Sequence, residues 1–336
     1  MKKTPVIIIS GFLGSGKTTL LLKLLHTLQA SRIKPAILMN ELGKADVDGR
    51  IITEAVQELP LEKLFDGCIC CSKKSEIAGS ILNLLALAPD VILVELTGVA
   101  NPEEVIDTMS EPELLHKITL HKIITVLDAE HVLEYSSIFS SDRELVHTLR
   151  RQLDIADIVL VNKQDLVSHT QLSKVERLIR KHNEQAVIFH TIYGQFQQEA
   201  VIEGLVPLQL QASASTAFKV VSPQHHGHAN RDPIHSERQI QTSFSRIQTI
   251  MIPISKQSPI SLQKLSRWLK SKGQQVLRAK GYVPLEHFPI PSLVQFAGRH
   301  IRQEQTSYQG DYYLVIIGFE MDENSLLAEW QANVLH

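Results

Sequence analysis

Two groups of residues whose types and spacing could carry out chemistry lie within the first 71 positions. Gly11-Phe12-Leu13-Gly14-Ser15-Gly16-Lys17-Thr18 matches the pattern G-x-x-x-x-G-K-[ST] at every position. Cys68-Ile69-Cys70-Cys71 begins 51 positions after Lys17 and contains all 3 cysteines of the chain. The first pattern is typical of loops that bind nucleotide phosphates. Clustered thiolates suit soft or borderline cations such as Zn²⁺, Cu⁺ or Co²⁺. The pair predicts a protein that couples nucleotide state to metal binding.

The phosphate pattern also has the flanking elements it needs. Residues 6–9 form a β-branched run typical of a buried parallel strand, and residues 18–25 have the leucine content of a helix. We expect Lys17 to bridge the β- and γ-phosphates and the Thr18 hydroxyl to ligate Mg²⁺. Backbone N–H groups and the helix N-terminus should hold the phosphates, with contacts from Gly11, Gly14, Ser15, Gly16 and Thr19. The alternative is a glycine-rich turn that binds nothing.

A second nucleotide motif follows another expected strand. Residues 158–161 are apolar, and Asn162-Lys163-Gln164-Asp165 comes directly after them. This N-K-x-D sequence resembles the guanine motif of P-loop GTPases. An aspartate can accept both the N1–H and the 2-amino group of guanine, and adenine offers neither arrangement. The motif therefore predicts GTP rather than ATP; a surface turn is the alternative.

An acid ends a third expected strand, at residues 91–94. Glu95 would lie at the carboxyl edge of the sheet, where α/β proteins bind ligands. We expect it to be a catalytic residue together with Lys17 and Thr18, either as the second-shell Mg²⁺ acid or as a metal-sensing contact. A helix-capping carboxylate is the alternative. Asp128, after the apolar residues 123–127, has a similar position and a weaker claim.

The cysteines and a histidine tract are the candidates for a transition-metal site. Three sulfurs leave one tetrahedral position open, as a delivery site requires, whereas a closed structural zinc site holds its metal by about 10–16 kcal/mol. The alternatives are three small buried hydrophobic residues or a disulfide. The tract His225-His226-Gly227-His228, followed by His235, is either a metal-capture arm or a solvated linker.

Composition limits the function classes. A net charge of −2 argues against nucleic-acid or membrane partners, and a hydrophobic content of 43% is ample for packed cores. No stretch approaches the roughly 20 apolar residues of a membrane span. We therefore expect a soluble cytoplasmic protein.

The chain should divide into two domains and a linker, given its 336 residues. Residues 1–205 predict an α/β domain of the P-loop NTPase type, with a doubly wound, mostly parallel sheet; its strands are expected near 6–9, 36–40, 91–95, 123–127, 158–161 and 187–190. Residues 206–242 are rich in Gln, Ser, His and Pro and predict a linker. Residues 243–336 predict a smaller α+β domain, with strands near 247–253, 275–279, 292–297 and 312–319 and helices near 261–271 and 323–334.

These motifs together resemble the CobW family of metal-chaperone GTPases, relatives of the GTPases that deliver nickel to hydrogenase and urease. The resemblance covers nearly the whole chain. It rests on residues 11–21, 40–43, 67–71, 95–98 and 101–102, and then on 277–281, 294–298 and 317–318. It implies hydrolysis of GTP to GDP and phosphate, Mg²⁺, and transfer of zinc or a similar ion to a client metalloprotein. It also implies Cys70 and Cys71 as principal metal ligands, with Cys68 and Glu41 beside them. The sequence leaves the oligomeric state open, with a homodimer as one of the possibilities.

One departure from the family pattern concerns metal choice. The family usually reads Asn-Glu-Phe-Gly-Glu, but Lys44 stands where the second glutamate is expected. A lysine cannot ligate a metal as a carboxylate does, so metal affinity could differ from the family norm. The leading hypothesis is a GTP-driven metallochaperone for zinc, in which the loop from Glu41 through Cys71 acts as the switch. The rivals are a signalling GTPase with structural or redox cysteines, a passive zinc buffer, and a cobalt-handling protein of cobalamin synthesis.

Overall fold

The structure is a computed structural model, and it describes residues 3–41, 61–65, 72–98, 100–137, 143–205 and 245–335. The predicted metal ligands Cys68, Cys70 and Cys71 lie outside these ranges, as do Lys44 and the tract from His225 to His235. Glu41 is described as part of a strand, without its side chain.

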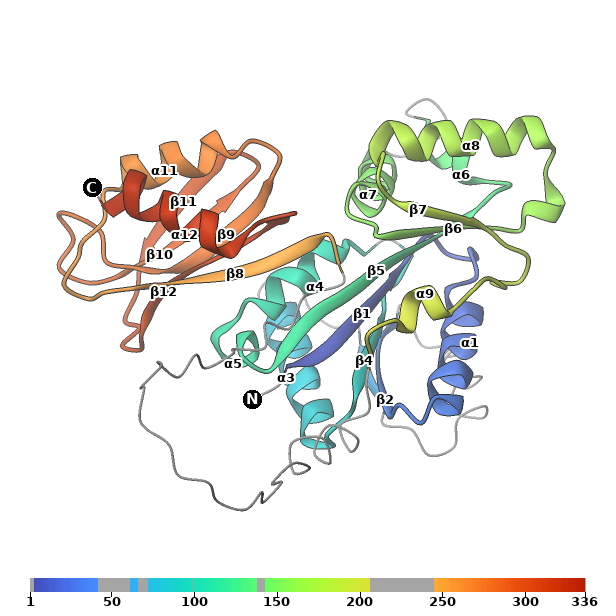
Figure 1. Ribbon diagram of the computed structural model, residues 1–336, viewed down its shortest axis with the longest axis horizontal. Coiled ribbons are helices and arrows are strands. Elements are labelled where there is room, and N and C mark those ends of the chain that lie inside the picture. Colours follow the sequence, from blue (N-terminus) through green and yellow to red (C-terminus); the bar gives the residue numbers. More distant parts are fainter. Residues whose placement is uncertain are drawn as a thin grey trace, which may run out of the picture.

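The first sheet has seven parallel strands. They are β1 (Thr4–Ser10), β2 (Pro35–Glu41), β3 (Leu61–Phe65), β4 (Val91–Glu95), β5 (Ile118–Asp128), β6 (Ile158–Asn162) and β7 (Val187–His190). Their order is β3-β2-β4-β1-β5-β6-β7, and every neighbouring pair is parallel (Figure 1). This confirms the predicted doubly wound α/β fold.

Helices cover both faces of this sheet, because successive apolar side chains along a strand point to opposite faces and each face needs a cover. Ile7 and Ile9 of β1 pack with the leucines of α1 (Lys17–Ala30). Val6 and Ile8 face the other way, toward α3 (Ser72–Ala86), α4 (Pro102–Met109) and α5 (Pro112–Leu115). Strand β6 packs on α7 (Arg143–Asp154) and α8 (His169–His182). The shorter elements are α6 (Val132–Tyr135), a 3₁₀ turn at Gln164–Leu166 and α9 (Glu199–Ile202).

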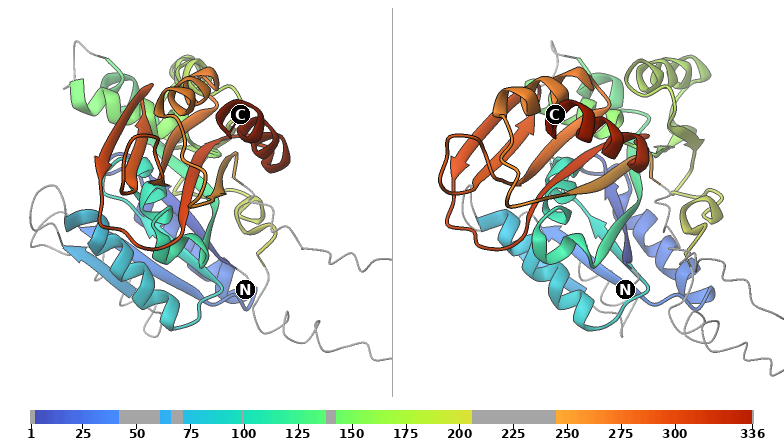
Figure 2. Two further views of the ribbon diagram at one scale, coloured as in Figure 1. Left: turned by 90° about the vertical axis from the view of Figure 1, so that its left-hand side faces the viewer. Right: turned by 60° about the vertical axis from the view of Figure 1, so that its left-hand side comes forward.

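The second sheet has five antiparallel strands. They are β8 (Ile247–Ile254), β9 (Val276–Val283), β10 (Ser292–Ala297), β11 (His300–Gln305) and β12 (Tyr312–Phe319), in the order β11-β10-β9-β12-β8. Its helices are α11 (Leu262–Ser271) and α12 (Glu323–Trp330), and a π-helical turn follows at Gln331–Leu335. The expected smaller α+β unit is present. Figure 2 shows α11 and α12 beside this sheet.

The two sheets are joined through strand β12, which is buried on both faces. Tyr313, Val315 and Ile317 pack into the core that contains α4 and α5. Leu314 and Ile316 face the core formed with α11 and α12. The continuous apolar sequence of β12 therefore reflects two interfaces rather than one.

Ion pairs flank this apolar contact. Arg278 of β9 places Nε 2.7 Å from Oδ1 of Asp107 on α4, and the Asp107 side chain has 0% exposure. Lys280, two residues along β9, pairs with Glu111. Charged groups thus fix where the second sheet lies against α4 and the residues that follow it.

Two edge strands were not expected from the sequence. β3 carries Glu62 and Lys63 at its centre, and β11 reads His-Ile-Arg-Gln-Glu-Gln, so neither has a continuous apolar run. Edge strands tolerate charge because one side is not covered by another strand. The hairpin that joins β10 to β11 turns at Gly298 and Arg299. Both residues have positive φ, as a two-residue type I′ turn requires.

Within the described residues, no helix combines the length and the apolar content needed to cross a membrane.

Candidate nucleotide-binding site

The phosphate loop connects the end of β1 to the start of α1. Gly11, Gly14 and Gly16 have φ values of 134°, 72° and 105°, which side chains rarely adopt. A Cβ on Gly16 would also lie 2.5 Å from Nδ2 of Asn162. Helix α1 has no side-chain cap and no acid in its first turn. The first N–H groups of a helix have no intrahelical partners, and here no side-chain cap takes their place. Such a helix start, facing a glycine-rich loop, is an arrangement that binds phosphate.

Two polar side chains of the loop lie inside it. Lys17 is 7% exposed, and its Nζ donates to the carbonyl oxygen of Phe12 over 3.0 Å, so the ammonium stands over the loop. Ser15 is fully buried, and its hydroxyl has no hydrogen-bond partner among the described residues. A buried hydroxyl without a partner is costly, and a phosphate oxygen would satisfy it.

The predicted magnesium residues meet where the start of α1 approaches the end of β4. The Thr18 hydroxyl donates to Oε1 of Glu95 over 2.9 Å. Glu95 ends β4, beside Ile9 of β1, and is 5% exposed. A hydroxyl and a carboxylate oxygen are hard donors of the kind Mg²⁺ prefers. These residues fit the ion that the fold implies.

The segment after Glu95 lies against the phosphate loop. A Cβ on Gly98 would lie 2.5 Å from the backbone nitrogen of Leu13, so only glycine allows this approach. The Leu13 side chain itself is 82% exposed. The sequence Glu95-Leu96-Thr97-Gly98 therefore joins the predicted magnesium acid to the predicted phosphate loop.

The N-K-x-D segment is tied to the phosphate loop by Asn162. Its Nδ2 donates to the Ser15 carbonyl over 2.8 Å, and its Oδ1 accepts from the Thr191 hydroxyl and the Gly194 N–H, each over 3.0 Å. Asn162 thus holds three loops together, while Asp165 remains exposed at the end of β6. The loop after β7, with Thr191 and Gly194, was not identified from the sequence. Its only signal is a glycine just after an expected strand.

Asp128 does not face Thr18 and Glu95 but pairs with the base loop. Its Oδ2 lies 2.6 Å from Nζ of Lys163, and its Oδ1 accepts from the Glu130 N–H over 3.0 Å. His131 Nδ1 lies 3.3 Å from the same Oδ2. Burial by itself raises the pKa of the Asp128 carboxyl, but the hydrogen bonds from Lys163, Glu130 and His131 and the charge of Lys163 outweigh it and hold the pKa below its usual value.

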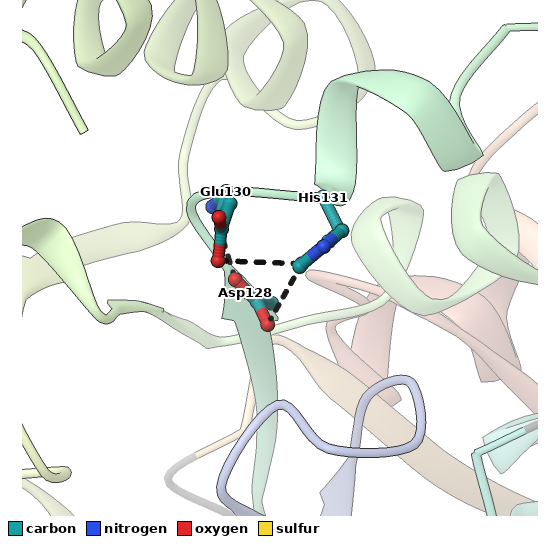
Figure 3. Close-up of side chains that lie close together, drawn as sticks. All are labelled: Asp128, Glu130 and His131. Carbon is teal, nitrogen blue, oxygen red and sulfur yellow. Dashed lines mark hydrogen bonds and ion pairs between the residues drawn. The ribbon is translucent and has the colours of Figure 1, made fainter. Parts of the chain in front are cut away.

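The group Asp128, Glu130 and His131 has the composition of a metal site. Its candidate ligand atoms lie within 4.8 Å of one another (Figure 3). The Lys163 ammonium, however, already contacts Asp128 Oδ2, and a cation bound there would meet a positive charge at close range. The arrangement is that of an ion-paired carboxylate rather than a metal centre.

A cavity of about 920 Å³ lies elsewhere, between the two sheets. Its lining includes Arg151, His182, Arg246, Arg278 and Arg299 and no residue of the phosphate loop. Among the described residues, the candidate nucleotide site is the carboxyl edge of β1, β4, β5 and β6, and this cavity lies apart from it.

Two family models match the chain. Residues 5–190 match the CobW/HypB/UreG nucleotide-binding domain, and residues 250–334 match the C-terminal domain of the cobalamin synthesis protein cobW. A protein of Pseudomonas aeruginosa named zinc chaperone CobW is 28% identical over 97% of this chain and 90% of its own length. Zinc-regulated GTPase metalloprotein activator 1 of Saccharomyces cerevisiae is 26% identical over 97% of this chain and 82% of its own.

A zinc-bound structure of the YjiA GTPase of Escherichia coli is 21% identical, covers 99% of both chains and superposes with a TM-score of 0.43. The first family model by itself spans more than half of the 336 residues. The chain therefore belongs to the CobW/HypB/UreG family of nucleotide-binding proteins and carries the cobW C-terminal domain.

Proposed function

We propose that this protein is a GTPase that couples GTP binding and hydrolysis to the binding and delivery of a transition metal, zinc first, to a client metalloprotein. The observation that carries the proposal is the contact between Thr18 and Glu95 at 2.9 Å, because it joins a phosphate loop to the acid of a neighbouring strand. The full-length relatives are named a zinc chaperone and a zinc-regulated GTPase metalloprotein activator, which favours zinc over cobalt.

Each site residue has a role in this proposal. The N-terminus of α1, with Gly11, Gly14, Gly16 and Thr19, holds the phosphates, and Lys17 neutralises the β- and γ-oxygens. Thr18 and Glu95 would hold Mg²⁺, which would neutralise charge that develops on the phosphate oxygens. Asp165 selects guanine beside Lys163. Water then attacks the γ-phosphorus and the bond to the bridging oxygen breaks, which gives GDP and phosphate.

The metal motif would respond to the nucleotide through its place in the chain. Cys68, Cys70 and Cys71 lie between β2 and β4 in sequence, and Met39 of β2 is the register partner of Glu95. The cysteines follow β3, whose carboxyl end lies at the same edge of the sheet as Glu95, with β2 between the two strands. Contacts of Glu41 and the cysteine segment with the γ-phosphate would order it, and hydrolysis would release it.

The broader organisation is part of the proposal. We assign residues 1–205 to the GTPase domain, 206–242 to a linker and 243–336 to the C-terminal domain. We also propose a cytoplasmic protein that acts on a protein client, with a homodimer as one assembly to be tested by its mass in solution with each nucleotide.

Zinc affinity measured with each nucleotide tests the coupling. We expect zinc to bind more tightly with a non-hydrolysable GTP analogue than with GDP, by roughly 5- to 150-fold, the range of about 1–3 kcal/mol of coupling. Reciprocity requires zinc to tighten the analogue by the same factor. The affinity should also fall as pH decreases, because thiolates must lose their protons to bind.

The measurement is a competition titration against a chromophoric chelator, with the Cys70→Ala/Cys71→Ala double variant as the test of the ligands and Cys68→Ala as its single-site comparison. Loss of the nucleotide effect only in the double variant supports the proposal. Identical zinc affinity with both nucleotides and in the double variant would leave a nucleotide-binding protein with an incidental cysteine cluster.

A further inference from the structure

Asp128 is buried at the nucleotide edge of the sheet, yet the proposed reaction gives it no role. It is 7% exposed and ends β5, between β1 with the phosphate loop and β6 with the base loop. Its register partner is Asn162, the first residue of the N-K-x-D motif. A nucleotide that runs from the phosphate loop to Asp165 must pass over the end of β5.

The Asp128 carboxylate determines where the Lys163 side chain lies. Lys163 leaves the end of β6 and reaches sideways to the end of β5, where Nζ meets Oδ2 of Asp128 at 2.6 Å. Its backbone has φ of 60°, an uncommon conformation for a residue with a side chain. Strained backbone of this kind persists only where surrounding contacts enforce it.

Other contacts make Asp128 a fixed anchor rather than a mobile surface acid. Its Oδ1 accepts from the Glu130 N–H over 3.0 Å, and His131 Nδ1 approaches Oδ2 at 3.3 Å. Gln171 of α8 donates to the carbonyls of Ala129 and Glu130 over 3.3 and 3.2 Å, which holds the following turn against the helix. The pair with Lys163 is therefore built on a rigid base.

We propose that Asp128 is a positioning residue of the base site: it holds the Lys163 ammonium so that the methylene chain of this lysine forms one wall for the nucleoside. Asp128 acts through Lys163 and does not touch the phosphates. The inference rests on the proposed GTP function, and it adds a residue that no motif of the sequence assigns to nucleoside binding.

A double-mutant cycle tests this arrangement. Asp128→Asn keeps the size of the side chain but loses the charge, and Lys163→Met keeps the stem but loses the ammonium. Each should weaken a non-hydrolysable GTP analogue by about tenfold, the loss that follows when one charge-assisted hydrogen bond is removed. The double variant should lose no more affinity for the analogue than the more impaired of the two single variants, because both changes break the same contact.

Tripolyphosphate serves as the second ligand, since it occupies the phosphate loop without a base. Its affinity, measured by calorimetry, should stay at the native value in all three variants. Glu329→Gln and Lys272→Met break a matched ion pair in the C-terminal unit and should leave both ligands unaffected. Thermal unfolding of every variant establishes that the protein measured is folded.

The possible outcomes distinguish the positioning role of Asp128 from the proposed GTPase function on which it rests. Native affinity for the GTP analogue in Asp128→Asn would overturn the positioning role, and so would an equal loss of the analogue and tripolyphosphate. Additive losses in the double variant would also overturn it, because Asp128 would then act independently of Lys163. A native chain that binds tripolyphosphate but no guanine nucleotide would instead overturn the proposed function.

Discussion

At the scale of single residues, several polar side chains of the site hold its loops rather than face a ligand. Asn162 is 3% exposed, and its side-chain amide forms hydrogen bonds with Ser15, Thr191 and Gly194. Buried polar groups are retained when every donor and acceptor is used, because the same low dielectric that strengthens these bonds penalises a missing one. In the proposed site the exposed Asp165 would contact the base, while the buried Asn162 ties the loop that carries it to the phosphate loop.

Replacing Lys17 by Ala should abolish GTP hydrolysis while the protein stays folded. In the proposed function the ammonium acts on phosphate charge, and its Nζ donates to the carbonyl of Phe12 in the phosphate loop. Phosphate release and thermal unfolding are the measurements. Lys23→Ala, on the same helix and only half-buried, is the control and should keep native turnover. Native hydrolysis by the Lys17 variant would remove this lysine from the reaction.

Asp165→Asn should change the nucleotide preference from guanine toward xanthine. In the proposed site the carboxylate would accept two guanine N–H groups, whereas an amide can donate to the carbonyl that xanthine presents at the 2-position. Binding of GDP and XDP to both forms is the measurement, and the native protein should prefer GTP to ATP by at least about tenfold. Asp311→Asn, an exposed aspartate of the C-terminal unit, is the matched control. Equal affinity of the native chain for GTP and ATP would contradict the assignment.

At the scale of elements, the sequence predicts the strands that carry an apolar run, including the edge strands β7 and β8, and misses the edge strands β3 and β11. Strands β1, β4 and β6 read as apolar runs because helices cover both sides of the sheet. β3 and β11 carry charged residues and could not be recognised from an apolar pattern.

Motif residues of the site were predictable, whereas contacts across strands were not. Lys17, Thr18 and Asp165 belong to patterns with fixed spacing. The pair Asp128–Lys163 depends on β5 and β6 being neighbours in the sheet, which no local pattern specifies. The predicted cysteine ligands lie outside the described residues, and their role remains a proposal.

Helix α4 follows the Glu95–Gly98 segment, and its start depends on Asn101. The Asn101 side chain accepts from the Glu103 N–H over 3.0 Å, and Pro102 occupies the first helical position. Asn101→Ala should lower the free energy of unfolding by about 0.5–2 kcal/mol, and Asn101→Asp should retain most of it. Urea denaturation compares the two variants. Equal stability of the Ala and Asp variants would show that the cap is not needed.

At the scale of the whole molecule, the C-terminal sheet packs against helices α4 and α5 of the first unit as well as against its own helices. Its strand β12 packs Tyr313, Val315 and Ile317 against α4 and α5. Both tryptophans of the chain, Trp268 and Trp330, lie in the opposite core with ring centroids 5.4 Å apart. Tryptophan fluorescence therefore reports the C-terminal unit alone, while far-ultraviolet circular dichroism reports both units.

Arg278→Met should destabilise the C-terminal unit through the contact between the two sheets. The substitution takes the guanidinium away from the Asp107 carboxylate, which has 0% exposure, and removing one partner of a buried pair costs about 3–5 kcal/mol. Lys280→Met, whose partner Glu111 is 25% exposed, should cost no more than about 1 kcal/mol. In urea, the fluorescence transition of the Arg278 variant should move to lower denaturant than that of the Lys280 variant. Coincident transitions in the two variants would mean that the Arg278–Asp107 pair does not secure the second sheet to α4.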